Sequence, residues 1–276
     1  MDQFLLLGDS LTERSFSPHL TFSLGAALTH AYARKLDLLN RGLSGYNTTQ
    51  ALRVLPHCLP SPHSSPGAPA TSAGGTLRLL TIWFGANDAR LPGTPGGPDQ
   101  SVELAQFRRN LKAMATHAAV RAHEGVRIVL MTPPPIDERM CGRSDAEKYP
   151  ELAGRGVRRR SAAHTAAYAR AVREVGVETG TPVVDVWTAV MVRCGYAGGG
   201  AGMSAQDGEV VVGSLEAPTN EMLQGFLVDG LHLSGEGYKV VFGELMGLIG
   251  REWPEMMPSQ LGMRLPAWDD ARAWRE

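Results

Sequence analysis

Short apolar runs and amphipathic stretches alternate along this chain. The apolar runs cover residues 4–7, 36–39, 77–84, 127–131 and 182–186. Each is long enough for one strand and too short for a typical helix. Runs that are apolar almost throughout are typical of strands covered on both faces, as in a parallel sheet.

The amphipathic stretches have the period of a helix. One stripe, with spacings of three and four, consists of Leu104, Phe107, Leu111, Met114 and Ala118. A second stripe near the end consists of Tyr238, Val241, Phe242, Leu245, Leu248 and Ile249. Residues 157–179 are rich in alanine, a strong helix former. Strands that alternate with helices need crossover connections, so the pattern predicts a three-layer α/β/α sandwich around a mostly parallel, flavodoxin-like sheet.

Two segments have the composition of loops. Residues 60–75 are rich in proline, glycine and serine, and residues 195–208 are rich in glycine. We expect both to be surface insertions in one domain that spans residues 1–276. A domain boundary in the first is less favoured because the sheet needs strands from both sides of it.

The totals exclude several classes of protein. The formal net charge is −1, which gives no field that would attract nucleic acid. No apolar run approaches the roughly 20 residues that span a bilayer, and Asp2 stands where a secretory signal would carry basic residues. Three widely spaced cysteines without a C-x-x-C pair favour neither a disulfide framework nor a metal site. We therefore expect a cytoplasmic protein without a metal or other cofactor.

Small and polar residues follow three of the predicted strands. The first strand runs into Gly8, Asp9 and Ser10, the second into residues 40–45, and the third into residues 85–88. Ligands collect at the carboxyl ends of parallel strands, so these residues are expected to share one edge of the sheet. Each group alone is also typical of an ordinary turn.

A fourth element favours a shared site over a set of ordinary turns. Asp229 and His232 stand three residues apart in a polar turn before the last predicted helix. A carboxylate at that distance can accept the imidazole N–H, which leaves the other ring nitrogen free to take a proton from a serine. The nearest rival is His123 beside Glu124, which we expect to lie in a charged surface stretch.

Together these four blocks resemble the SGNH hydrolases, also called GDSL esterases and lipases. The blocks are Gly-Asp-Ser-Leu at 8–11, a glycine block that ends at Gly45, Gly-x-Asn-Asp at 85–88 and Asp-Gly-x-His at 229–232. Within that family, residues 40–48 and 83–89 are most similar to the isoamyl acetate-hydrolysing esterases. The insertion at 60–75 is longer than expected of that subgroup.

The resemblance implies a role for each matching residue. Ser10 would be the nucleophile, His232 the general base and acid, and Asp229 the carboxylate that orients the imidazole. The oxyanion hole would use the backbone N–H groups of Ser10 and Gly45 and the side chain of Asn87. We expect Asp9 and Asp88 to hold their loops rather than to react.

Other sites are less well supported. The more familiar esterase elbow G-x-S-x-G is absent, as are a phosphate-binding G-x-x-x-x-G-K-[ST] motif and the strand that would precede a dinucleotide fingerprint at 198–202. The cluster Arg158-Arg159-Arg160 is expected to form one solvated face of a helix. Residues 137–156 and 195–226 are candidates to cover the site.

The sequence therefore predicts a hydrolase of small, short-acyl esters such as acetates. A carbohydrate or lipid deacetylase or acyltransferase that uses the same residues stays open, as does a flavodoxin-like binding module that holds a flavin phosphate in the loop at 9–15. The expected partner is a small-molecule ester, with no nucleic acid and no stable membrane insertion. A homodimer is common among similar proteins and is expected here on that ground alone.

Overall fold

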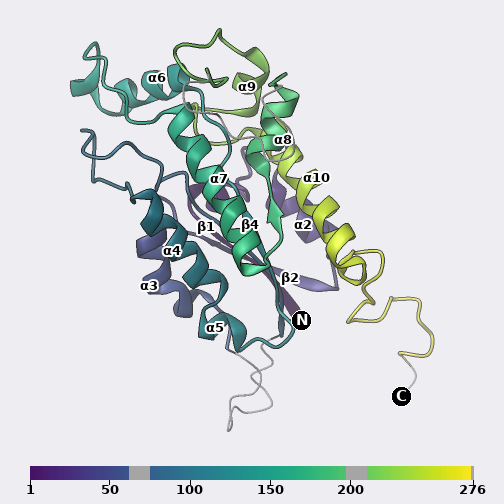
Figure 1. Ribbon diagram of the computed structural model, residues 1–276. Helices are drawn as coiled ribbons and strands as arrows, with labels where there is room; N and C mark the ends of the chain where they lie inside the picture. The colour runs from purple at the N-terminus through teal and green to yellow at the C-terminus, as the bar shows by residue number, and fades with distance from the viewer. Residues whose placement is uncertain (62–74, 197–209, 275–276) are drawn as a thin grey trace.

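A computed structural model describes residues 1–61, 75–196 and 210–274 of the chain (Figure 1). Within these ranges, five parallel strands form one sheet in the order β2–β1–β3–β4–β5. The strands are β1 (Asp2–Gly8), β2 (Leu36–Gly42), β3 (Leu77–Trp83), β4 (Arg127–Met131) and β5 (Val183–Val184). This is the flavodoxin-like strand order, so the predicted fold class is confirmed.

Helices cover both faces of the sheet (Figure 1). The helices of the described ranges are α1 (Ser10–Arg14), α2 (Leu24–Ala31), α3 (Thr48–Cys58), α4 (Leu104–Ala115), α5 (Ala118–Arg121), α6 (Glu138–Lys148), η1 (Pro150–Leu152), α7 (Ala162–Thr179), α8 (Val186–Arg193), α9 (Glu221–Phe226), α10 (Gly235–Glu252) and η2 (Pro254–Met256). Successive side chains of β1 point to opposite faces. Phe4 and Leu6 pack with α2, α8 and α10, whereas Leu5 and Leu7 pack with α3, α4 and α7.

Helix caps explain where the observed elements depart from the predicted ones. The run at 182–186 gives only the short β5, because the side chain of Asp185 accepts the Thr188 N–H and caps α8. Ser161 caps α7 in the same way, so that helix begins at Ala162 rather than near residue 157. The three arginines at 158–160 therefore precede the helix, and the prediction that they form one of its solvated faces is wrong.

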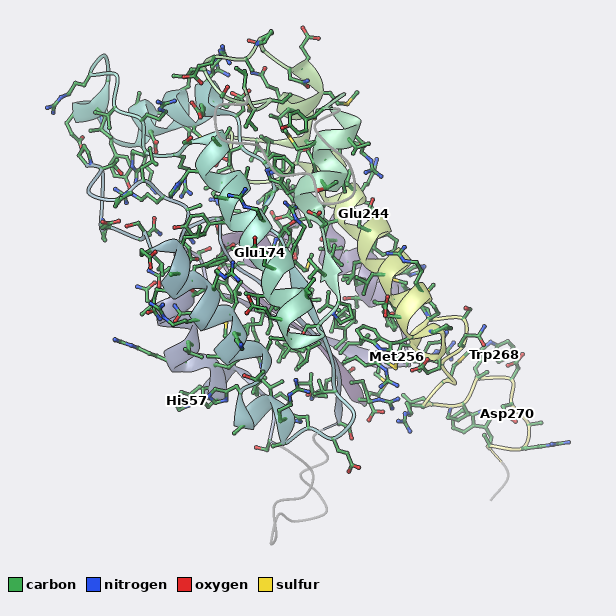
Figure 2. All side chains as sticks on the ribbon, viewed as in Figure 1. His57, Glu174, Glu244, Met256, Trp268 and Asp270 are labelled. Atoms are coloured by element: carbon green, nitrogen blue, oxygen red, sulfur yellow. The ribbon has the colours of Figure 1, made fainter. Side chains whose placement is uncertain are left out.

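The upper edge of the sheet in Figure 1 is the edge where the strands end. α6 and α9 lie above it, while the C-terminal segment that carries Trp268 and Asp270 leaves the far end of α10 and lies away from it (Figures 1 and 2). The predicted insertions at 60–75 and 195–208 fall almost entirely outside the described residues. Among the helices that are described, none is long and apolar enough to cross a bilayer.

Candidate active site

Ser10 stands at the carboxyl end of β1, as the first residue of α1. The turn that places it there is fixed by Asp9, whose buried carboxylate accepts the Leu11 N–H at 2.9 Å and caps the helix. β1 has a hydrogen-bonded neighbour on each side, so this end of the strand is well ordered by the sheet. The Ser10 side chain is consequently held at the edge where the parallel strands end.

A close approach of two backbones seats α1 on the sheet. A Cβ atom at Gly42, the last residue of β2, would lie 2.1 Å from the Glu13 nitrogen and 2.3 Å from the Glu13 Cα. Both are backbone atoms, which cannot turn aside as a side chain can. Only glycine allows α1 to rest directly on the end of β2, and that contact sets the height of Ser10 above the strands.

Asp229 and His232 belong to a tight turn before α10. An antiparallel bridge between Leu227 and Leu233 closes the turn, and the Val228 N–H donates to the His232 carbonyl at 2.9 Å. Gly230 has φ +88°, and a Cβ there would lie 2.6 Å from the Asp137 carbonyl oxygen. The turn therefore needs a glycine at this position, and through it the turn docks on the start of α6.

The fold brings Ser10, His232 and Asp229 together. Ser10 Oγ lies 2.9 Å from His232 Nε2, and His232 Nδ1 lies 2.6 Å from Asp229 Oδ2. An ionised carboxylate only accepts hydrogen bonds, so Nδ1 carries the proton and Nε2 accepts from the serine hydroxyl. These are the three side chains that the sequence proposed for catalysis, and they form one continuous hydrogen-bonded chain.

The carboxylate of this chain is held in its charged form. Burial alone would raise the pKa of Asp229, but hydrogen bonds from the His232 ring and from the backbone N–H groups of Leu231 and His232 outweigh it. The pKa of Asp229 is therefore well below its ordinary value. Arg14 Nη1, at 3.9 Å from Asp229 Oδ2, adds a partly exposed positive charge on the same side.

Gly45 and Asn87 lie in the loops that follow β2 and β3. The Asn87 side chain donates to the Tyr46 carbonyl at 2.9 Å, which ties the two loops together and leaves its second N–H available. Gln100 Nε2 donates to the Gly45 carbonyl at 2.7 Å and so supports the loop that follows β2. Gly45 and Asn87 line the same cavity as Ser10 and His232.

Two buried aspartates lie beneath these loops. Asp88 accepts the backbone N–H and the hydroxyl of Thr48, at 2.9 and 2.5 Å, and so holds the start of α3. Burial raises the pKa of Asp88 to about 6 and that of Asp9 to about 7. Their contacts are with the backbone and with Thr48, as expected of residues that hold loops.

The cavity beside Ser10 has a volume of about 730 Å³. Its far wall comes from α6 and the residue that follows it, namely Cys141, Ser144, Asp145, Lys148 and Tyr149. This wall falls within residues 137–156, which were expected to cover the site, and the segment thus contributes part of the cavity lining. Of residues 195–226, none in the described part lines this cavity.

Arg159 and Arg160 also line the cavity, and sequence reasoning missed them. Arg159 is buried and pairs with Asp145, while Arg160 donates to the Ala86 carbonyl, next to Asn87. Ser161, an N-cap residue directly before the alanine-rich stretch, was the signal that these arginines lie outside the helix.

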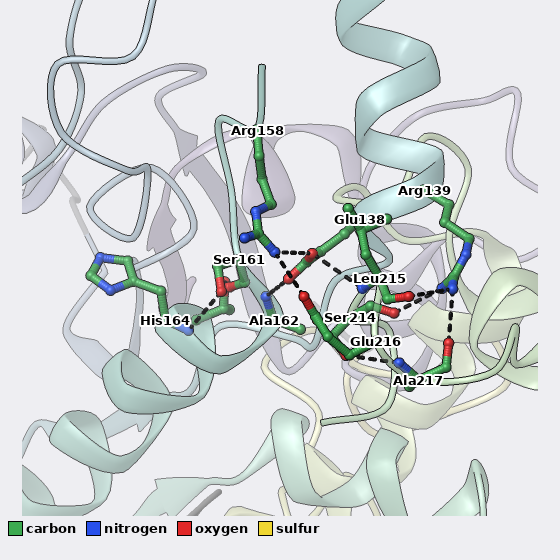
Figure 3. A network of polar contacts seen from close by, with 11 residues as sticks. Glu138, Arg139, Arg158, Ser161, Ala162, His164, Ser214, Leu215, Glu216 and Ala217 are labelled. Carbon is green, nitrogen blue, oxygen red and sulfur yellow. Dashed lines mark hydrogen bonds and ion pairs between the residues drawn. The ribbon is translucent and has the colours of Figure 1, made fainter. Parts of the chain in front are cut away.

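A buried carboxylate fixes the segment that carries these arginines (Figure 3). Glu138, at the start of α6, accepts Arg158 Nη1 at 2.9 Å and the Ala162 N–H at 2.7 Å. The same carboxylate accepts the Leu215 N–H at 3.3 Å. One side chain therefore holds both ends of the stretch 158–162 and joins it to the loop at 214–217.

The remaining candidates do not join the site. His123 is buried after α5 rather than lying in a charged surface stretch, so that prediction is wrong. Within the described ranges, no three His, Cys, Asp or Glu side chains cluster as metal ligands would. Residues 198–202, where the sequence argues against a dinucleotide fingerprint, lie outside the described residues.

Comparison with known proteins gives consistent matches. The model of the GDSL-like Lipase/Acylhydrolase family matches residues 6–240. A GDSL esterase/lipase of Arabidopsis thaliana is 34% identical, with 93% of this chain and 89% of that protein covered. The isoamyl acetate-hydrolyzing esterase of Saccharomyces cerevisiae is 30% identical, with 98% and 94% covered.

Solved structures share the fold at lower identity. The lipase/acylhydrolase from Enterococcus faecalis has a TM-score of 0.58 and 21% identity, with 96% of this chain and 100% of that chain covered. An acetylxylan esterase from Geobacillus stearothermophilus has a TM-score of 0.56 and 17% identity, with 91% and 95% covered.

Proposed function

This chain belongs to the GDSL-like lipase/acylhydrolase family and is a carboxylic ester hydrolase, and on that premise we propose that it cleaves small, short-acyl esters such as acetates through an acyl-enzyme on Ser10. The observation that carries the proposal is the hydrogen-bonded chain from Ser10 Oγ through His232 to Asp229, at the side of a cavity of about 730 Å³.

In the proposed first step, Ser10 Oγ attacks the ester carbonyl while His232 Nε2 takes the hydroxyl proton. The tetrahedral intermediate then collapses, and the imidazolium returns that proton to the departing alcohol. The negative charge of Asp229 stabilises the imidazolium between these events. Water, deprotonated by the same nitrogen, attacks the acyl-enzyme, and His232 gives the proton back to Ser10 Oγ as the carboxylic acid leaves.

The charge of the tetrahedral intermediate needs donors that are already in position. The backbone N–H groups of Ser10 and Gly45 and the free N–H of Asn87 are proposed to supply them. Each such donor is worth about 3–4 kcal/mol in a preorganised site. Asn87 suits this role because the Tyr46 carbonyl already orients its amide.

The preference for a small acyl group rests on the curated relatives. Among those named isoamyl acetate-hydrolyzing esterases, the yeast protein is similar over 98% of this chain, and a homolog in Homo sapiens, 31% identical, over 97%. We extend the acetate substrate in that name to this chain as a proposal.

The test is a panel of 4-nitrophenyl esters of rising acyl length, assayed with the wild-type protein and with Ser10→Ala. The wild-type protein should cleave the acetate fastest and should bind a fluorophosphonate probe on Ser10. Ser10→Ala should lose both properties, whereas the control Ser17→Ala, outside the cavity, should keep them. Turnover retained by a folded Ser10→Ala variant would overturn the acyl-enzyme, and a maximum at long acyl chains would overturn the acetate preference.

A further inference from the structure

We infer that the site accepts esters whose alcohol portion carries a carboxylate, and that Arg160 binds this carboxylate. The inference rests on the proposed function, since it concerns the alcohol side of the same cavity. Because the proposed acyl group is small and uncharged, the negative charge must belong to the alcohol.

Positively charged side chains outnumber negatively charged ones in the cavity. Positive charges come from Arg14, Arg90, Lys148, Arg159 and Arg160, whereas negative charges come from Asp99, Asp145 and Asp229. The chain as a whole is close to neutral, so this surplus is a property of the cavity. Curved walls that carry one sign of charge attract substrates of the opposite sign.

Most of these cations already have partners. Arg90 is buried and donates to the carbonyls of Thr94, Pro95 and Pro98, which shapes the loop beside the cavity. Arg159 pairs with Asp145, and Arg14 lies near Asp229. The hydrogen bonds of Arg90 and Arg159 stabilise the wall and leave little for a ligand, whereas Arg14 is half exposed and faces the charge of Asp229.

Lys148 and Arg160 form no ion pair with a described acid, but Lys148 is an exposed ammonium on a flexible stem over the Tyr149 ring. Arg160 is a half-buried guanidinium, and most of its donors are unused. Its guanidinium donates from Nη1 to the Ala86 carbonyl, and no acid of the described residues forms an ion pair with it. Two acids lie close enough to influence it, and neither neutralises it. Asp145 is committed to Arg159, and burial raises the pKa of Asp9 to about 7, which leaves that group partly protonated near neutral pH.

The guanidinium is also held in place before any ligand arrives. Glu138 fixes residues 158 and 162 on either side of it (Figure 3), and the Leu91 N–H donates to the Arg159 carbonyl at 2.9 Å. A cation that is already positioned loses little entropy on binding. A guanidinium with free N–H groups matches the two oxygens of a carboxylate better than an ammonium does.

The experiment compares matched pairs of acetyl esters. 3-Acetoxybenzoate and 4-acetoxybenzoate carry the carboxylate, and their methyl esters are the neutral counterparts. For at least one pair, the wild-type kcat/KM should be about 10-fold or more higher for the anionic ester, and Arg160→Met should lower that ratio by about 10- to 100-fold. Arg160→Lys should recover part of the ratio. The exposed control Arg155→Met removes the same charge outside the cavity and should keep the wild-type ratio.

The ratio distinguishes binding from a purely structural role. If Arg160 only holds the Ala86 carbonyl, Arg160→Met lowers kcat/KM for both esters equally, and that result overturns the inference. A wild-type preference for the neutral esters also overturns it. Should Arg160→Met not fold, benzoate and benzamide are compared as inhibitors of the wild-type protein, and equal inhibition counts against the inference. Failure of the proposed function would instead show as 4-nitrophenyl acetate turnover by Ser10→Ala.

Discussion

Two regions of the cavity are built in different ways. The rim, formed by Ser10, Gly45 and Asn87, lies where β1, β2 and β3 end, and strand pairing together with hydrogen bonds from side chains to the loop backbone holds it. The charged wall is held by side chains that reach across the fold, and it consists of Cys141, Ser144, Asp145, Lys148, Tyr149, Arg159 and Arg160. Strand register sets where the rim lies and hydrogen bonds to backbone groups complete it, whereas the wall depends on ion pairs and hydrogen bonds of its side chains.

This difference suggests that the rim and the charged wall have different roles. Groups on the rim are proposed to act on the ester carbonyl, which every substrate shares, so changes there should affect all esters alike. Groups on the charged wall are proposed to face the alcohol portion of the substrate, which varies, so changes there should alter the order of preference. The following predictions test that division.

The largest effect is expected when the imidazole loses its carboxylate. Asp229→Asn should lower kcat by about 10⁴-fold for neutral and anionic esters alike, because an amide no longer favours the tautomer that accepts the serine proton. Steady-state kinetics with 4-nitrophenyl acetate measure this, and Asp270→Asn on the C-terminal segment is the matched control. A loss below 10-fold would contradict the role proposed for Asp229.

Loss of one oxyanion donor should have a smaller effect. Asn87→Ala should lower kcat by about 10²- to 10³-fold with little change in KM, because the donor acts mainly on charge that develops in the transition state. The anionic-to-neutral ratio should stay as in the wild-type protein. A change in that ratio would show that the rim also selects the alcohol, which would break the comparison.

Loss of the hydrogen bonds that hold the charged wall should lower the stability of the protein. Glu138→Ala leaves the Ala162 and Leu215 N–H groups without their acceptor, so the free energy of unfolding should fall by about 2–4 kcal/mol. Urea denaturation measures the change. Glu147→Ala, on the exposed side of the same helix, should change it by less than about 0.5 kcal/mol. Equal effects of the two variants would show that the Glu138 network does not hold the wall.

The last prediction concerns how the stability of the folded protein depends on pH, which leaves the catalytic groups unchanged. Burial raises the pKa of Asp9 to about 7, above its value of about 4 in the unfolded chain. Between these values the folded protein retains a proton that the unfolded chain has lost, so stability falls as pH rises from about 4 to 7. Asp9→Asn keeps an oxygen for the Leu11 N–H and has no proton to lose. Its stability relative to wild type should therefore increase across this window, by about 3 kcal/mol.

Urea denaturation at several pH values gives the difference between the two proteins. Asp88 has the same direction of shift and is present in both, so it largely cancels from that difference. Two stability profiles that run parallel between pH 4 and 7 would contradict the raised pKa of Asp9.

The sequence predicts the rim well and the charged wall poorly, for a physical reason. Ser10, Gly45 and Asn87 each follow an apolar run, and parallel strands bring such positions to one edge whatever the details of packing. The Asp229–His232 pair is local, so its contact follows from spacing alone. Its meeting with Ser10, in contrast, depends on where α10 packs.

Arg160 shows why the wall could not be predicted. Its partner is the carbonyl of Ala86, a backbone atom that every residue possesses and that no sequence pattern marks. The link from Glu138 to Ala162 and Leu215 is equally invisible, because it joins three segments that are distant in sequence. Alanine-rich composition near residue 160 favoured a helix, and the Ser161 cap decided where that helix begins.

The seat of α1 on Gly42 has a consequence for engineering. A side chain at position 42 would push α1 away from the sheet and move the hydroxyl of Ser10 relative to His232, so a mutant library that varies this position would consist mostly of inactive clones. Ser144 and Lys148 border the same cavity from α6. Saturation mutagenesis aimed at new alcohol groups should therefore start at those two positions and leave position 42 unchanged.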